Sequence, residues 1–210
     1  GSPGSVKLFH VVLDKCIASS EGGAITFSSV TSQIKMSYVT IKSAASDLDG
    51  GAISIQYCAD VIMDHVEIDS AHAKKGRGGG ISLQGSKGKS SKLAISDSTF
   101  KSCTAAGTGK GYGGAISIHQ GVTAITSTKF VGNTAEKAGA VHIGTKASVT
   151  FNVGINFKNN VATISTTEKK WYTLWQGTTA TSMEFSTCSA AEEDGFLVEI
   201  ASSPRIDAMT

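Results

Sequence analysis

A six-residue motif built around two glycines recurs along the chain, and it constrains the fold more than any other feature of the sequence. It reads GGAITF at Gly22–Phe27, GGAISI at Gly50–Ile55, GGGISL at Gly78–Leu83, GGAISI at Gly113–Ile118 and AGAVHI at Ala138–Ile143. The first residues of successive copies are 28, 28, 35 and 25 positions apart. A period of about 20–50 residues is typical of a solenoid, in which every repeat forms one coil.

A second motif alternates with the first, an apolar residue followed three positions later by Cys, Asn or Ala. It occurs at Leu13–Ala18, Ile41–Ser46, Ile68–Ala73, Phe100–Ala105, Phe130–Ala135, Phe157–Ala162 and Phe185–Ala190. Apolar and small polar residues alternate at 52–55, and segments such as 61–63 read as further short strands. Seven copies, with three short strands per coil, predict an all-β, single-domain parallel β-helix of about seven coils over residues 6–200. The winding is expected to be right-handed, as crossovers between parallel strands are.

The composition fits this fold and excludes some classes of partner. A net charge of +2, from 19 Lys and Arg against 17 Asp and Glu, gives no general attraction to nucleic acid, so no nucleic-acid partner is predicted. No apolar run reaches the ~18–20 residues that cross a bilayer, so this segment is predicted to have no membrane span. Residues 1–5 (GSPGS) read as an expression scar and 201–210 as a C-terminal tail. The chain is expected to be a segment of a longer protein.

One column of the repeat carries cysteine or asparagine in most coils. Its members include Cys16, Cys103, Cys188, Asn133 and Asn160. Neighbouring cysteines in this column are three coils apart, about 14 Å at ~4.8 Å per coil. Because a disulfide needs Cα atoms within ~7 Å, the sequence predicts free thiols here and at Cys58. The asparagines are expected to form a short structural ladder that satisfies the turn backbone.

The two motifs together resemble those of a known family. GGAI stands at Gly22–Ile25, Gly50–Ile53 and Gly113–Ile116, and FxxN stands at Phe130–Asn133 and Phe157–Asn160. This alternation resembles the repeats of the chlamydial polymorphic outer membrane proteins, and similar repeats occur in surface proteins of some protists. The resemblance covers roughly residues 13–162. It implies a pectin-lyase-like β-helix, secreted or displayed on the cell surface and often concerned with adhesion to a host receptor or glycan.

A cluster in the third coil suggests an enzymatic alternative. His65, Glu67 and Asp69 alternate with Val66 and Ile68, so they are expected to share the outward face of one strand. A carboxylate pair beside a histidine can move a proton or bind a metal, as in a lyase or hydrolase acting on an acidic polysaccharide. The simpler interpretation is a solvated strand face.

Basic residues gather around the longest repeat. Lys74, Lys75 and Arg77 precede it, and its loops and strands add Lys87, Lys89 and Lys92. Loops leaving on one side would form a patch suited to sulfated glycans or anionic headgroups. The alternative is that these residues only keep the loops soluble and discourage strand pairing.

The remaining polar positions are expected to carry no chemistry. The polar residues inside the glycine motifs, expected on the outward face, are Thr26, Ser54, Ser82, Ser117 and His142. His10 and His119 have no partner in register and are expected to be plain surface residues. GKGYGG at 109–114 precedes a strand, whereas a phosphate loop precedes a helix. The sequence therefore predicts no cofactor and no metal.

The sequence thus predicts a non-catalytic, surface-exposed or secreted β-helix that acts in adhesion or in binding a receptor or glycan. An acidic-polysaccharide enzyme and a purely structural spacer are the alternatives. Because the end of a solenoid is an open sheet edge, end-to-end self-association is also expected to be possible.

Overall fold

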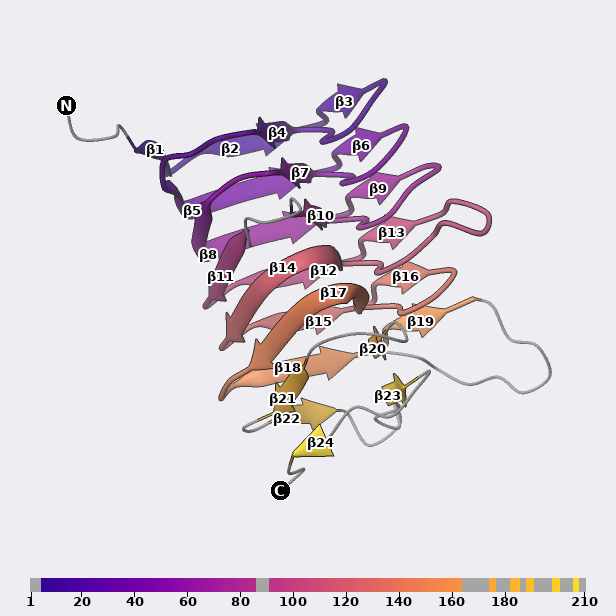
Figure 1. Ribbon diagram of the computed structural model, residues 1–210. Coiled ribbons are helices and arrows are strands. Elements are labelled where there is room, and N and C mark those ends of the chain that lie inside the picture. Colours follow the sequence, from indigo (N-terminus) through magenta and orange to yellow (C-terminus); the bar gives the residue numbers. More distant parts are fainter. Residues whose placement is uncertain are drawn as a thin grey trace.

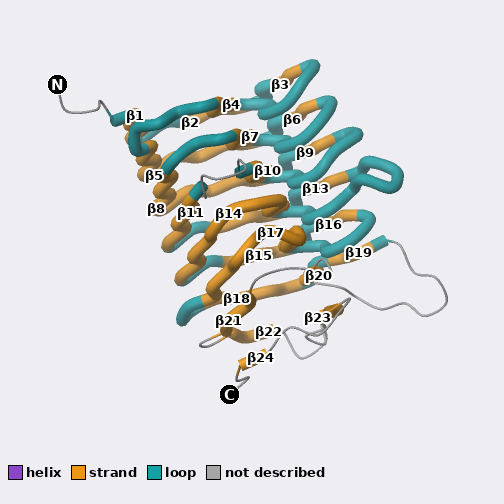
Figure 2. Tube along the Cα trace, in the orientation of Figure 1, coloured by secondary structure: helices purple, strands orange, loops and turns teal. Residues whose placement is uncertain are grey.

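The structure is a computed structural model that describes residues 5–85 and 91–163, and strand segments at 174–176, 182–185, 188–190, 198–200 and 206–207. Every regular element in these residues is a β-strand, and the strands are wound into a parallel solenoid (Figures 1 and 2). Within the described part of the chain there is no helix long and apolar enough to cross a membrane.

Each coil contributes to three columns of parallel strands, which we call faces A, B and C. Face A contains β4 (Ile25–Ser28), β7 (Ile53–Gln56), β10 (Ile81–Gln84) and the first parts of β14 (Ile116–Thr126) and β17 (Val141–Phe151). Face B contains β1 (Val6–Phe9), the first parts of β5 (Ile34–Lys42) and β8 (Asp60–Asp69), β11 (Lys92–Ser96) and the second parts of β14 and β17. Face C contains β2 (Val12–Asp14), the second parts of β5 and β8, β12 (Thr99–Lys101), β15 (Lys129–Val131) and β18 (Ile155–Lys158).

A fourth strand in each coil was not foreseen. It is only two residues long and pairs in a separate six-stranded sheet. Its members are β3 (Ile17–Ala18), β6 (Ala45–Ser46), β9 (His72–Ala73), β13 (Thr104–Ala105), β16 (Thr134–Ala135) and β19 (Val161–Ala162). With the loops that follow, these strands form a projection along one side of the solenoid, which we call the arm (Figure 1). Two residues are too few for an alternating pattern to reveal a strand.

The coils stack in the predicted register, but there are slightly fewer of them. The solenoid makes about five turns, against the seven predicted. Further along, β20 (Leu174–Gln176), β21 (Ser182–Phe185), β22 (Cys188–Ala190), β23 (Val198–Ile200) and β24 (Ile206–Asp207) continue the parallel pairing. The last copy of the second motif is out of register, because Phe185 pairs with Phe151 and Cys188 with Ile155. Phenylalanine occurs in both neighbouring columns, at Phe151 and at Phe157, so the motif alone could not set the register.

The corners between strands use left-handed backbone. The first glycine of each motif has positive φ, from 64° to 68°, and Ala138 has 57° in the fifth copy. The second glycine serves close approach instead. A Cβ atom on Gly51 would lie 2.1 Å from the carbonyl oxygen of Gly79 in the next coil. The corner between faces B and C has positive φ at His10, Tyr38, His65, Asp97 and Ser127, where no glycine marks it.

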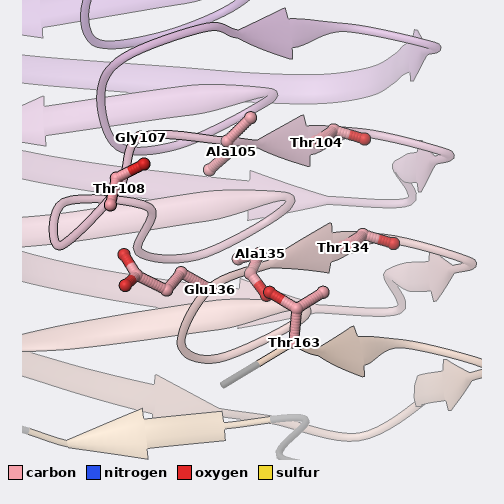
Figure 3. A pocket seen from close by; sticks show the side chains of 9 residues that line it. Thr104, Ala105, Gly107, Thr108, Thr134, Ala135, Glu136 and Thr163 are labelled. Carbon is pink, nitrogen blue, oxygen red and sulfur yellow. The ribbon is translucent and has the colours of Figure 1, made fainter.

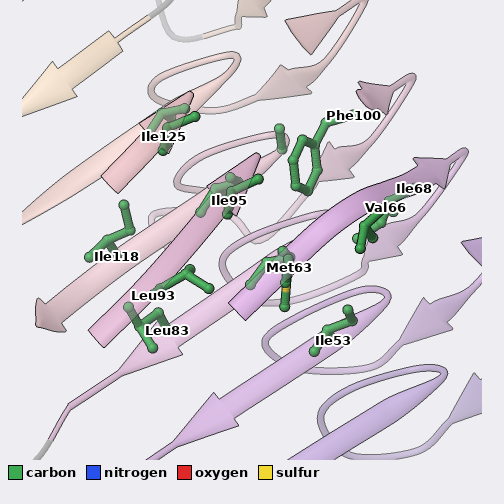
Figure 4. Packing of buried hydrophobic residues seen from close by; sticks show 14 of the residues in the cluster. Ile53, Met63, Val66, Ile68, Leu83, Leu93, Ile95, Phe100, Ile118 and Ile125 are labelled. Carbon is green, nitrogen blue, oxygen red and sulfur yellow. The ribbon is translucent and has the colours of Figure 1, made fainter. Parts of the chain in front are cut away.

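The core is a narrow column of aliphatic and aromatic side chains (Figure 4). Phe100, Phe130 and Phe157 stack along it, with ring centroids 5.3 and 5.0 Å apart. Each coil therefore buries its apolar residues against the equivalent residues of its neighbours, as expected for a solenoid.

The asparagine ladder is present as predicted. Asn133 Oδ1 accepts the backbone N–H of Cys103 (3.0 Å), and its Nδ2 donates to the carbonyl of Phe100 (3.1 Å). Asn160 Oδ1 accepts the backbone N–H of Asn133 (3.1 Å) and its Nδ2 (2.8 Å), and Asn160 Nδ2 donates to Phe130 (2.9 Å). Each asparagine thus satisfies the corner of the coil before it.

The cysteines whose side chains are described are free thiols, as predicted. Cys58 and Cys103 are buried, whereas Cys16 is only half-buried in the first coil. Complete burial raises the pKa of the Cys103 thiol to about 12, so it stays protonated and behaves as a small apolar group.

Candidate functional site

The structure separates the three residues proposed as an acid–base cluster. His65 occupies the corner between faces B and C with φ of 52°, so it does not share a strand face with Glu67 and Asp69. The side chains of His65 and Glu67 are exposed and that of Asp69 is half-buried, as predicted for an outward face, but the left-handed corner at His65 changes the direction of the chain between faces B and C. Asp69 accepts the hydroxyl of Ser70 (2.8 Å) and lies 3.6 Å from Lys101 Nζ. The corner position therefore removes the histidine from the carboxylate pair.

The predicted basic stripe is divided between different parts of the coil. Lys74 and Lys75 lie on the arm, where Lys74 Nζ forms an ion pair with Asp47 (2.8 Å) that lowers the pKa of the Asp47 carboxyl. Lys92 begins β11 on face B, and only Arg77 borders face A. Lys87 and Lys89 lie outside the described residues. The described members therefore do not form one continuous patch.

The row of polar side chains on face A is buried except at Thr26, which corrects the expectation of an exposed face for the other four members. Ser54, Ser82, Ser117 and His142 all have less than 10% of their surface exposed. The side chain of Glu21 covers the N-terminal part of the row and accepts the hydroxyl of Ser54 (2.9 Å). The residues before two of the glycine pairs reach the strand of the next coil, since Glu21 accepts the hydroxyl of Ser54 in β7 and the Tyr112 ring lies 4.7 Å from that of His142 in β17.

These covering residues form a column of their own, which we call the covering column. Backbone hydrogen bonds join each member or its neighbouring glycine to the next coil, as from Gly50 N–H to the Arg77 carbonyl (2.8 Å). In chain order the members are Glu21, Asp49, Arg77, Tyr112 and Lys137. The column is therefore acidic in the first two coils, whereas in the third to fifth coils it carries two basic residues, Arg77 and Lys137, on either side of Tyr112.

The third to fifth members of the covering column, Arg77, Tyr112 and Lys137, form a cationic cluster with His119 of β14 and Lys146 of β17. The guanidinium carbon of Arg77 and the ammonium nitrogen of Lys137 each lie 5.4 Å from the ring centroid of Tyr112. Both distances are within the range of a cation–π interaction. Arg77 Nη1 lies 3.1 Å from His119 Nδ1, where it donates a hydrogen bond to the neutral imidazole.

The charges of this cluster perturb the nearby histidines. Desolvation, then the positive charges of Arg77 and Lys146, lower the pKa of His119, and Asp49 opposes this effect. Burial lowers the pKa of His142 to about 3, with a further contribution from Arg77. The His142 ring lies 4.7 Å from that of Tyr112, and its Nδ1 lies 3.0 Å from Ser117 Oγ. The His142–Ser117 pair is therefore uncharged and buried within face A, and a molecule in solution cannot contact it.

A second constellation occupies the corner between faces B and C. Asp64 Oδ2 lies 3.1 Å from His65 Nδ1, and ligand atoms of Asp64, His65 and Asp97 all lie within 4.8 Å of one another. The imidazole of His65 stacks on Tyr38 (4.7 Å), which stacks in turn on His10 (4.9 Å). His10 therefore belongs to an aromatic stack, although it was expected to have no partner.

A groove of about 370 Å³ lies beside the arm at β13, β16 and β19 (Figure 3). Its lining is made of small residues and one carboxylate: Thr104, Ala105, Ala106, Gly107, Thr108, Thr134, Ala135, Glu136 and Thr163. Glu136 already accepts the backbone N–H of Gly111 (3.3 Å). Pockets that bind small molecules usually have large apolar or aromatic walls, which this lining lacks.

The first coil exposes part of its apolar surface. Phe9, Val12 and Ile17 have 63%, 70% and 74% of their surface accessible. This coil pairs with a neighbour on one side in the described residues, so the other edge of its strands is open. An open apolar edge is the feature on which the expectation of end-to-end association depends.

Sequence reasoning singled out Arg77 and His65 but missed the residues that cluster with them in the structure. Tyr112, Lys137 and Arg77 share one position of the repeat, directly before the glycine pair. Comparing that position across the five copies would have revealed the change from acidic to basic. Asp97 could be found by no such rule, because nothing in its repeat marks it as a corner.

Comparison with models of known protein families gives no match, and neither do searches of curated proteins and of solved structures.

Proposed function

We propose that the protein is a non-catalytic binding module that holds an acidic glycan through the cationic cluster of face A. The observation that carries this proposal is the position of Tyr112 between Arg77 and Lys137, with both cations 5.4 Å from its ring centroid. The ring holds two like charges close together on the border of one strand face.

The chemistry of the cluster suits carboxylate and sulfate groups. A guanidinium binds such groups through two parallel hydrogen bonds, and a lysine contributes a mobile point charge. The charges of Arg77 and Lys146 act on His119, where the carboxylate of Asp49 opposes them, and those of Arg77 and Lys137 act on His142. Asp49 accepts the backbone N–H of Arg77 (2.8 Å). This local excess of positive charge attracts an anion and supplies no general acid.

The charge change along the covering column gives the proposed site a direction. Glu21 and Asp49 at the N-terminal end repel a polyanion, whereas the cluster from the third coil onward attracts it. We therefore propose that a linear acidic chain lies over the third to fifth coils and avoids the first two.

We also propose that the protein is secreted or displayed on a cell surface and acts in adhesion. This part rests on the resemblance of the GGAI and FxxN motifs to those of the polymorphic outer membrane proteins. An enzyme acting through Glu67 and Asp69 remains the alternative from a different class, and a structural spacer is a third.

The test is binding of heparin, polygalacturonate and neutral dextran at about 50 and 200 mM NaCl, with cleavage of the acidic chains followed in the same samples. We expect binding of the acidic chains only, weaker at the higher salt because charges are screened. The double variant Arg77→Gln/Lys137→Gln should bind at least about 10-fold more weakly, since it loses two charged contacts. The matched control Lys35→Gln/Lys158→Gln removes the same charge from exposed positions on faces B and C.

Equal weakening in the control and in the Arg77/Lys137 variant would overturn the assignment to this cluster and leave only net charge. Cleavage of polygalacturonate that Glu67→Gln abolishes would favour the enzyme. Absence of both binding and cleavage would favour the spacer. End-to-end association is checked by light scattering over a range of concentrations, with Ile17→Ser as the variant expected to reduce it.

A further inference from the structure

The corner between faces B and C brings together three side chains of metal-binding type from two coils. Asp64 and His65 belong to β8 in the third coil, and Asp97 follows β11 in the fourth. Asp64 pairs in register with Ser96, so the next residues, His65 and Asp97, are neighbours across the coil boundary. Their ligand atoms and that of Asp64 all lie within 4.8 Å of one another.

The separation of Asp64 and His65 fits two ligands of one ion. Asp64 Oδ2 and His65 Nδ1 are 3.1 Å apart. Two ligands of a tetrahedral zinc ion, each at about 2.0–2.1 Å, are roughly 3.3 Å apart. The carboxylate of Asp97, which is exposed, has an oxygen within 4.8 Å of the ligand atoms of both Asp64 and His65.

Neighbouring residues hold two of the three ligands in place. Ser96 Oγ donates to Asp64 Oδ1 (2.7 Å), which directs the other oxygen of this carboxylate to His65. Tyr38 stacks on the His65 ring at 4.7 Å and limits its rotation. Such support of ligands by a surrounding layer of contacts is a regular feature of metal sites.

We propose that Asp64, His65 and Asp97 form a binding site for a divalent transition-metal ion such as Zn²⁺, with water completing its coordination. One imidazole nitrogen with two carboxylate oxygens favours zinc and its neighbours over Ca²⁺ and Mg²⁺, which take oxygen ligands. The bound ion joins the third coil to the fourth at an exposed corner. This proposal is independent of the cationic cluster on face A.

The variants that test the site follow from the backbone of the corner. His65 and Asp97 have φ of 52° and 47°, in the left-handed region that asparagine tolerates. His65→Asn and Asp97→Asn therefore remove a ligand without straining the corner. Ser96→Ala removes the support of Asp64 and should cost about 10-fold in affinity. Asp69→Asn is the control, a carboxylate on the same strand but outside the cluster.

The experiment uses the full chain after treatment with a chelator. Zn²⁺ is titrated by calorimetry, and Mn²⁺ is added in substoichiometric amounts to a ¹⁵N-labelled sample to broaden amide signals near the ion. We expect one Zn²⁺ per chain, affinity at least about 10-fold lower for His65→Asn and Asp97→Asn, and no change for Asp69→Asn. Broadening should centre on residues 64–66 and 96–98.

Two results would overturn the site. One is unchanged Zn²⁺ affinity in Asp97→Asn, and the other is Mn²⁺ broadening centred elsewhere, for instance around His72 or Cys16. A melting temperature raised by Zn²⁺ in the wild type and in Asp69→Asn, but not in Asp97→Asn, would support the proposed link between coils.

Discussion

Replacement of Asn133 by alanine tests the structural ladder at its centre. The side chain makes three buried hydrogen bonds, with Cys103 N–H (3.0 Å), the Phe100 carbonyl (3.1 Å) and Asn160 Oδ1 (2.8 Å). Each bond contributes about 1 kcal/mol net, and a buried donor left without a partner costs at least as much. Asn133→Ala is therefore expected to lower the free energy of unfolding by about 3 kcal/mol. For a chain of this length the melting temperature should fall by roughly 6–12 °C.

The measurement is urea and thermal unfolding followed by circular dichroism. Asn152→Ala is the matched control, because Asn152 donates one partly buried bond to Thr126 Oγ1 (3.1 Å). It should lose about 1 kcal/mol or less. If Asn133→Ala is no less stable than Asn152→Ala, the ladder does not hold the corners together and the reasoning fails.

Three further predictions concern packing and protonation. Thr123 is fully buried, and its hydroxyl has no hydrogen-bond partner among the described residues, so Thr123→Val should raise stability by about 1 kcal/mol. The control Thr126→Val loses the hydrogen bond from Asn152 and should lower stability. The pKa of His142 is depressed to about 3 in the folded protein. The contribution of the neutral His142 side chain to stability is therefore fully present above the unfolded pKa of about 6.5, and it declines as the pH falls toward 3. Unfolding at pH 7.5 and 5 should therefore differ by about 2 kcal/mol, and a pH dependence unchanged in His142→Gln would contradict this. Gly51→Ala places a Cβ atom 2.1 Å from a carbonyl oxygen, so it should cost about 3 kcal/mol of stability or prevent folding. Gly109→Ala is the control, because Gly109 has φ of 70° but nothing within 4 Å of its Cβ position, and it should cost about 1 kcal/mol. Equal losses of stability in thermal unfolding of the two variants would argue against the close approach of coils.

The stacking of the coils could be predicted because equivalent residues recur at a regular spacing along the sequence. Glycine at Gly22 or Gly50 marks a corner, and apolar residues at fixed distances from it mark the core. The asparagine ladder followed from the same register, since Asn133 and Asn160 occupy equivalent positions one coil apart. The right-handed sense of the winding stays a prediction.

The candidate site was harder to predict because it depends on corners and covering residues. His65 sits in an alternating stretch, and only its left-handed backbone, shared with Tyr38 and Asp97, turns it away from Glu67. Ser54 and Ser117 read as an outward face, and they are buried because Glu21 and Tyr112 fold over the row. Alternation predicts which side of a strand a residue occupies, but not what covers that side.

The asparagine ladder also gives the solenoid a polarity. Asn133 completes the corner around Cys103, and Asn160 completes the corner around Asn133, so each coil is finished by side chains of the coil that follows it. Loss of the coil on the C-terminal side removes the asparagine side chain that accepts a corner N–H, whereas loss of the coil on the N-terminal side removes the backbone carbonyl that accepts the next N–H, as Cys103 does for Thr134. At the corners of this region the two directions along the rod are therefore not equivalent.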